Sequence, residues 1–200
     1  MQRDNILLIV AVVAVGISLF NLVVTVSEFT GFATQVGSAN LTIEQETSIN
    51  FTTTMINWSS GKIDDGKTIA YLDSEGNVIN GNWTAVSSGL VLENNGNINV
   101  TLTLQTGKTA ATFIGGTTPS APYYMWKVTN NETGSCNGGG EALNTSYFDV
   151  NQSGAAQFCK NFSYFNASNA IEIDINISIP EDSSKGTLGD TITAVAAAAN

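Results

Sequence analysis

The side chains that most often do chemistry in active sites are scarce in this sequence. The chain has 200 residues, no histidine and two cysteines, Cys136 and Cys159. Without histidine, neither a Ser-His-Asp nor a Cys-His arrangement is possible. The cysteines do not form a Cys-x-x-Cys motif, so zinc and iron–sulfur centres lack ligands. We therefore expect no metal and no cofactor.

Carboxylate pairs are the remaining candidates for catalysis, because two carboxylates can hydrolyse a glycoside. Such pairs occur at Asp64/Asp65, Glu172/Asp174 and Glu181/Asp182. Each pair falls in an expected turn or on the polar face of an expected strand, where ordinary exposed acids are the simpler interpretation. The stretch DSEGN (residues 73–77) begins like a calcium loop but lacks the bidentate glutamate, and a hairpin turn explains it better. We expect a protein that is not an enzyme.

The most frequent chemical signal is the acceptor sequence for N-linked glycans, Asn-X-Ser/Thr. The chain contains eleven such sequons, about twice the number that its composition predicts by chance. Only 12% of its residues are charged, so the surface needs another source of solubility, which sugars supply. We expect N-linked glycans among Asn40, Asn50, Asn57, Asn82, Asn99, Asn131, Asn144, Asn151, Asn161, Asn166 and Asn176.

The charge balance excludes two classes of partner. Seven Lys and Arg stand against 17 Asp and Glu, a net charge of −10. No basic stripe exists to neutralise phosphates, so nucleic acid is not expected, and an anionic membrane surface is equally unsuitable. In an exported chain Cys136 and Cys159 form one disulfide most simply, whereas two free buried thiols fit a cytosolic protein.

The beginning of the chain is strongly apolar. Residues 5–26 read NILLIVAVVAVGISLFNLVVTV and contain no charged side chain. At about 1.5 Å per residue, a helix of this length reaches across the hydrocarbon core of a membrane. Arg3 precedes this run, and Glu28 follows it with no further Lys or Arg before Lys62, so the positive-inside rule places the rest outside. The sequence therefore predicts one hydrophobic helix over residues 1–35.

From residue 36 onward the apolar period changes from helical to two, which is typical of strands. In NAIEIDINISIP the isoleucines of residues 171–179 alternate with polar residues. The same alternation in three other segments predicts side chains that point inward. They are Leu41 and Ile43 of ANLTIE, Ile49, Phe51 and Met55 of SINFTTTM, and Ile98, Val100, Leu102 and Leu104 of NINVTLTLQ. Further strands are expected at TIAYLD, SGLVLEN, YYMWKVT and DTITAVAAAA. Short strands at this spacing predict an antiparallel β-sandwich over residues 36–200.

The segment around the cysteines, residues 129–169, differs from the rest of this region. It is rich in Gly, Asn and aromatic residues and lacks clean alternation. We expect a long excursion that the disulfide closes. Such a loop either carries binding or forms a glycosylated cover over one sheet edge, and both interpretations stay open.

Two stretches, ENNGNINVTLTL and ISIPEDSSKGTLGDTITAVAA, resemble the framework of Ig-like sandwich modules common in archaeal surface proteins. The whole layout resembles archaeal type IV pilins, in which an apolar N-terminal helix leads into a glycosylated β-sandwich. The resemblance implies an α+β fold class, with a long hydrophobic helix followed by an all-β antiparallel Ig-like sandwich. It also implies a homopolymer whose helices bundle in the filament core, after a stage in the membrane. Small residues suit close helix packing, and the expected polymerisation residues are Leu7, Ala11, Ala14, Gly16, Ser18, Phe20, Asn21 and Val24.

Three fates of the apolar segment lead to different functions. Retained, it forms the core of an extracellular filament that serves adhesion to a host or cell-surface ligand. Retained in a bilayer, it anchors a single-pass surface protein or adhesin. Removed as a signal peptide after Ala33 or Ala39, it leaves a domain that polymerises by donating the strand ANLTIEQ to a neighbour.

The first residues of the chain bear on this choice. Prepilins carry a short basic leader that ends in Gly or Ala before the apolar segment. No such site precedes Asn5 in this sequence. We expect either that the numbering begins at the mature residue or that the segment is an uncleaved anchor.

Overall fold

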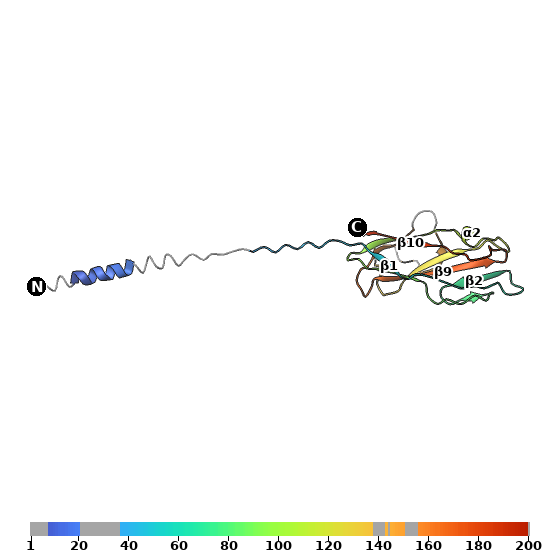
Figure 1. Cartoon of the computed structure of the whole chain (residues 1–200), viewed down its shortest axis with the longest axis horizontal. Coiled ribbons are helices and arrows are strands. Elements are labelled where there is room, and N and C mark those ends of the chain that lie inside the picture. Colours follow the sequence, from blue (N-terminus) through green and yellow to red (C-terminus); the bar gives the residue numbers. More distant parts are fainter. Residues whose placement is uncertain (1–7, 21–36, 138–142, 144, 151–155, 200) are drawn as a thin grey trace. The chain divides into compact units, whose positions relative to one another are not determined.

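The computed structural model of the chain is mostly β, and 37% of the residues that it describes are in strands or bridges; Figure 1 shows these strands. It describes residues 8–20, 37–137, 143, 145–150 and 156–199. The chain divides into two units, residues 1–43 and residues 44–200, and each is described by itself.

The expected long N-terminal helix, and with it the α+β class, is wrong. The described helix covers residues 8–20, about 13 residues. At 1.5 Å per residue this is about 20 Å, whereas a hydrocarbon core is about 30 Å thick. Among the residues that the structure describes, no helix is long and apolar enough to cross a membrane. Hydropathy alone overestimated the helix, because most helical stability comes from packing against other elements.

A seven-stranded antiparallel sheet forms the larger layer of the second unit. Its centre is β9, which pairs with β6 along one edge and with β4 and then β2 along the other. The outer strands β1, β3 and β7 pair with β4, β2 and β6 respectively. The bounds of the strands are β1 Ile49–Thr53, β2 Ile69–Asp73, β3 Val78–Ile79, β4 Leu90–Asn94, β6 Tyr124–Asn130, β7 Phe148–Asp149 and β9 Ala170–Pro180.

A three-stranded antiparallel sheet forms the smaller layer, in the order β10-β5-β8. Its strands are β5 (Val100–Thr106), β8 (Ala156–Phe162) and β10 (Ile192–Ala198). The one-turn helix α2 (Ala110–Phe113) follows β5 and is capped by Thr109. Sheets of seven and three strands differ from the four and three of an Ig constant-type domain. The expected Ig-like arrangement is therefore also wrong.

The hydrophobic core lies between the two sheets. Trp126 of β6 and Phe158 of β8 meet edge to face, with ring centroids 4.9 Å apart. Because these strands belong to different sheets, this contact joins the layers. The rest of the cluster comes from both sheets and from α2's C-terminal end, and its fully buried members include Leu72, Leu92, Val100, Leu102, Leu104, Ile114, Val128, Phe162, Ile171 and Ile173.

One strand prediction and the inward placement of one residue are wrong between residues 39 and 55, whereas the predicted strand SINFTTTM is present as β1. ANLTIE is not a strand, and its Leu41 and Ile43 side chains are 85% and 78% exposed. Met55, expected inward, is 68% exposed and lies beyond the end of β1. Alternation shows that a segment suits a sheet, but a strand forms only beside a partner. Within the described part of the chain, residues 39–44 have no partner strand.

The segment around the cysteines contains two strands, β7 and β8, that the sequence did not indicate. The register between β5 and β8 shifts twice, which is the mark of a β-bulge. As a result Phe158 and the adjacent Cys159 are both buried, and the alternation that identifies strands is lost. Part of this segment is therefore sheet and core, and not an excursion from the domain.

Candidate functional site

The N-terminal helix exposes apolar side chains on all sides. The large apolar residues within 8–20 are exposed by between 54%, at Val13, and 70%, at Phe20. A helix that is hydrophobic all round is normally buried in a large core, a bundle or a membrane. Its side chains therefore require an apolar environment that the described part of its own unit does not provide.

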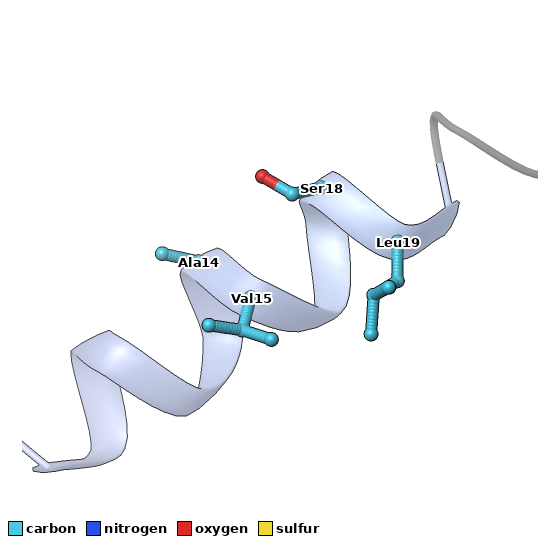
Figure 2. A pocket seen from close by; sticks show the side chains of 4 residues that line it. All are labelled: Ala14, Val15, Ser18 and Leu19. Carbon is cyan, nitrogen blue, oxygen red and sulfur yellow. The ribbon is translucent and has the colours of Figure 1, made fainter.

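Small residues leave a shallow hollow in the surface of this helix. Ala14 and Ser18 lie one turn apart beside the larger Val15 and Leu19, and these four side chains line an open hollow (Figure 2). At Gly16 an added Cβ would meet no other atom within 4 Å. Nothing in the described contacts of the chain therefore requires a glycine there, whereas a second helix in close contact would favour one.

The predicted polymerisation residues divide into two groups. Five of them lie on the described helix, on more than one of its faces: Ala11, Ala14, Gly16, Ser18 and Phe20. The other three lie outside the described residues: Leu7, Asn21 and Val24.

Nine of the predicted glycosylation sites fall on described residues, and none of these nine is fully buried. Asn144 and Asn151 lie outside the described residues. The exposed ones are Asn40, Asn50, Asn57, Asn82, Asn131 and Asn166, and the half-buried ones are Asn99, Asn161 and Asn176. A glycan at these positions leaves the core intact.

Hydrogen bonding separates the sequon asparagines from the others. A glycan is attached at the side-chain nitrogen Nδ2, so that atom has to be free. In the described part of the chain, the asparagines whose Nδ2 donates a hydrogen bond are Asn77, Asn80, Asn94, Asn97 and Asn169. None of these begins a sequon. Asn57 and Asn82 do begin sequons, and their side chains only accept hydrogen bonds, through Oδ1 from backbone N–H groups. Such bonds hold the side chain and leave Nδ2 available.

This division predicts opposite results for two asparagine substitutions. Asn57→Gln should remove the mass of one glycan and leave the unfolding midpoint nearly unchanged. Asn94→Ala should leave the glycan mass unchanged and destabilise by about 1–3 kcal/mol, the cost of unpaired buried polar groups, because its Nδ2 donates to the Ile98 and Phe162 carbonyls. Intact mass and urea unfolding of both variants provide the measurements. An unchanged mass for Asn57→Gln would remove this site from the predicted set.

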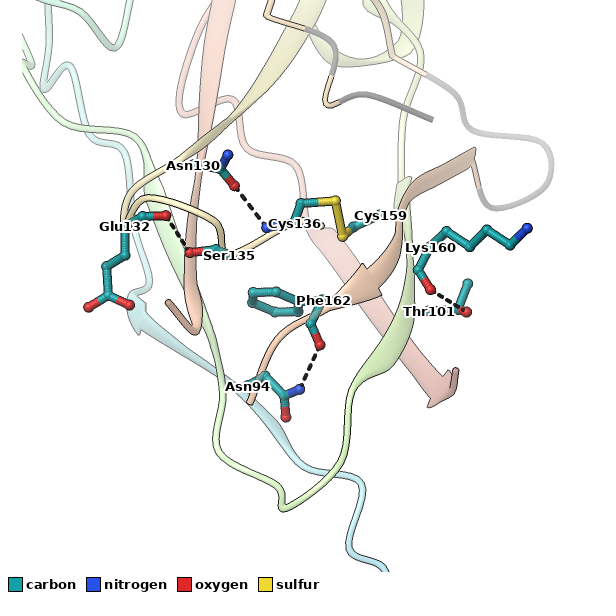
Figure 3. Close-up of a disulfide and its surroundings, with 9 residues drawn as sticks. All are labelled: Asn94, Thr101, Asn130, Glu132, Ser135, Cys136, Cys159, Lys160 and Phe162. Atoms are coloured by element: carbon teal, nitrogen blue, oxygen red, sulfur yellow. Dashed lines mark hydrogen bonds between the residues drawn. A yellow bond between two sulfur atoms is a disulfide. The ribbon is translucent and has the colours of Figure 1, made fainter. Parts of the chain in front are cut away.

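The predicted disulfide is confirmed: Cys136 and Cys159 are bonded (Figure 3). Cys159 lies on β8 and is fully buried. Cys136 is held by its backbone N–H, which donates to Asn130 Oδ1 at 2.9 Å, and by an antiparallel bridge to Phe162. The bond thus ties the loop after β6 to β8 of the smaller sheet by a covalent link.

Removing the disulfide should destabilise the β domain without unfolding it. The cysteines are 23 positions apart, and closing a loop of this size contributes roughly 3 kcal/mol through chain entropy. We expect the double variant Cys136→Ala/Cys159→Ala to lose about that much in urea unfolding. A reductant should lower the midpoint of the wild type and leave that of the variant unchanged. Equal sensitivity of both proteins to reductant would contradict this origin of the effect.

In two of the predicted carboxylate pairs, one carboxylate lies in an ordinary surface contact. Asp65 pairs with Lys62 at 3.2 Å on the surface. Asp182 accepts hydrogen bonds from the backbone N–H groups of Thr118 and Thr117, which lower the pKa of its carboxyl. The DSEGN stretch is a turn between β2 and β3, as expected. Asp73 accepts hydrogen bonds there from the backbone N–H groups of residues 75 and 77.

One cluster of charged side chains was not predicted from the sequence. Lys127 of β6 lies 2.5 Å from Glu75 Oε1 and 3.8 Å from Asp174 Oδ2. The Tyr147 hydroxyl donates to Glu75 Oε2 at 3.0 Å, and its ring lies 5.0 Å from Lys127 Nζ. Asp174 was placed on a solvent face by alternation, yet it is only 5% exposed. The sequence does contain one sign of this cluster, because Lys127 is the single basic residue in the middle of the otherwise uncharged strand YYMWKVT.

No cluster of three or more His, Cys, Asp or Glu suited to a metal ion occurs among the residues that the structure describes. Comparisons of the chain with protein-family models, curated proteins and solved structures find no match.

Proposed function

We propose that this chain is the structural subunit of an extracellular cell-surface filament, similar in plan to archaeal type IV pilins. The observation that carries the proposal is the N-terminal helix, whose apolar side chains are exposed on every side. In the proposed filament, the helices of identical copies pack against one another in the core. The β domains lie outside and provide the surface for adhesion.

Helix packing supplies the driving force of such an assembly. Burying apolar surface stabilises by about 25 cal/mol per Å², so even partial burial of a 13-residue apolar helix favours association. The small residues Ala14, Gly16 and Ser18 permit helix axes to approach closely. Before assembly, the same segment associates with the membrane, because its side chains need an apolar environment there too.

The β domain has the properties of a filament's outer surface. Its described sequon asparagines are exposed or half-buried with Nδ2 free, so glycans would face the solvent. The net charge of −10 and a coat of sugars disfavour collapse of neighbouring domains onto one another. The disulfide Cys136–Cys159 suits an oxidising extracellular location.

Material sheared from cells tests the proposal. We expect negative-stain microscopy to show filaments, and N-terminal sequencing of their subunit to begin at or before residue 5. Intact protein found only in detergent-extracted membranes, and never in sheared filaments, would support a single-pass surface anchor or adhesin in place of a filament.

A donor-strand fibre is the second candidate, and one observation favours it. Leu41 and Ile43 alternate in an unpaired segment and are 85% and 78% exposed, while β1 and β10 each pair along a single edge in the described sheets. Such a segment can complete the sheet of a neighbouring copy. In that case the subunit in sheared filaments would begin near residue 34 or 40, which is inconsistent with a core built from the N-terminal helices.

A further inference from the structure

We propose that Lys127 and Asp174 form an intramolecular isopeptide bond, an amide between Lys127 Nζ and Asp174 Cγ, with Glu75 as the proton carrier. This modification is independent of the proposed filament function. It would link β6 to the central strand β9. The domain would then contain two covalent cross-links, this amide and the disulfide.

The backbone places the two reacting side chains opposite each other. Lys127 and Asp174 are direct partners in the antiparallel register of β6 and β9, so their side chains lie on the same face of the sheet. Lys127 Nζ is 3.8 Å from Asp174 Oδ2, so the amine lies beside the carboxyl group whose carbon it would attack. The side chains are only 14% and 7% exposed. Water therefore competes little for the carboxyl carbon.

Neighbouring residues fix the carboxyl group of Asp174. The Ser74 hydroxyl donates to Asp174 Oδ1 at 2.7 Å, and the backbone N–H of Ile175 donates to Ser74 Oγ at 3.0 Å. Ser74 is fully buried. At Gly89 an added Cβ would lie 3.0 Å from Asp174 Oδ1 and 2.5 Å from the Ile173 carbonyl oxygen. The glycine therefore leaves the space that the carboxyl group occupies.

Glu75 and Tyr147 fix the amine. Glu75 Oε1 lies 2.5 Å from Lys127 Nζ, and the side chain of Glu75 is 43% exposed. Tyr147 covers Lys127 with its ring and holds Glu75 through its hydroxyl. Glu75 is thus hydrogen-bonded to the group that must lose protons, and the tyrosine limits the access of solvent.

The reaction needs a neutral amine and a neutral carboxylic acid. Burial raises the pKa of the Asp174 carboxyl, with the hydrogen bond from Ser74 opposing this shift. Glu75 takes one proton from the Lys127 ammonium and delivers it to the Asp174 carboxylate. The amine then attacks Asp174 Cγ, and a second proton passes through Glu75 to the departing hydroxyl. The products are one amide and one water, the net charge is unchanged, and no co-reactant is required.

Peptide mapping of the full chain tests the bond. The protein is made in a bacterial host that adds no N-linked glycans, extracted in mild detergent, reduced, alkylated, denatured and digested with trypsin. Lysines at 108, 127, 160 and 185 define the peptides of this region. We expect no cleavage after Lys127. A single branched peptide should join residues 109–160 to residues 161–185, with a mass lower than their sum by one water.

The chain contains an internal control for an ordinary ion pair. Lys62 and Asp65 lie 3.2 Å apart, but their side chains are 70% and 97% exposed. Trypsin should cleave after Lys62 normally. Complete cleavage after Lys127 in the folded wild type, with both linear peptides present, would overturn the proposal and leave Lys127 as an ion-pair partner only.

Substitutions separate the roles of the three residues. Lys127→Arg keeps the positive charge but should abolish the branched peptide, and Asp174→Ala should do the same. Asp174→Asn should still form the amide with loss of ammonia, so its branched peptide should have the same mass as that of the wild type. Glu75→Gln should slow formation at least tenfold relative to the wild type, measured by mapping samples taken at intervals after a short pulse of expression. An unchanged rate in that variant would remove Glu75 from the reaction.

Discussion

Val13→Arg should abolish filament assembly and leave the β domain folded. Val13 lies in the middle of the N-terminal helix and is 54% exposed in the single chain. In the proposed filament it is buried among apolar side chains of other copies. Burying an unpaired guanidinium costs several kcal/mol, and each 1.4 kcal/mol is about a tenfold change in an association constant. We therefore expect filaments in the sheared fraction to decrease by more than about a hundredfold.

Val195→Arg is the matched control for this experiment. Val195 lies on β10 and is also 54% exposed, so the same substitution is made at a site of equal exposure in the other unit. We expect its filaments to be as abundant as those of the wild type. Negative-stain counts and the amount of subunit per cell give both readouts. Normal filaments with Val13→Arg would show that the helix is not at a subunit interface, and would leave the donor-strand fibre as the better explanation.

The strands were predictable where one face alone is buried. In β5 the residues Val100, Leu102 and Leu104 alternate with threonines, and all three are buried as expected. Period-two alternation is a local property that the sequence carries by itself. The strand β8 was missed because its bulges place two adjacent residues in the core. A bulge depends on the partner strand, so it leaves no local signal.

The remaining errors have the same physical origin. The length of the N-terminal helix was overestimated because an apolar sequence shows that a segment has to be buried. It does not show how many of its residues are helical. Asp174 was assigned to a solvent face because alternation specifies which side of the sheet a residue lies on. What covers that side is decided by residues distant in sequence, here Ser74 and Tyr147. The disulfide was predictable because the chain has only two cysteines.

Trp126→Ala should cause the largest loss of stability of any single truncation in the β domain. Trp126 is completely buried and is the largest of the fully buried side chains. Its ring contacts Phe158 at 4.9 Å and Phe148 at 6.2 Å between centroids. Truncation removes these contacts and leaves a cavity between the sheets, at a cost of about 3–5 kcal/mol. A domain of ordinary stability has only about 5–15 kcal/mol in total, so the variant should be close to unfolding at physiological temperature.

Trp126→Phe distinguishes cavity formation from loss of a specific polar contact. Within the described residues, Trp126 Nε1 has no hydrogen-bond partner. The phenylalanine variant therefore loses side-chain volume but none of the hydrogen bonds that the structure describes. We expect it to lose less than half as much stability as Trp126→Ala in urea unfolding of the full chain, followed by circular dichroism at constant detergent. Because the slope of the free energy with urea reflects the surface exposed on unfolding, it should be similar in the two variants. Equal losses would show that a phenyl ring at this position does not restore the contacts with Phe148 and Phe158, and would contradict the expected dependence on side-chain volume.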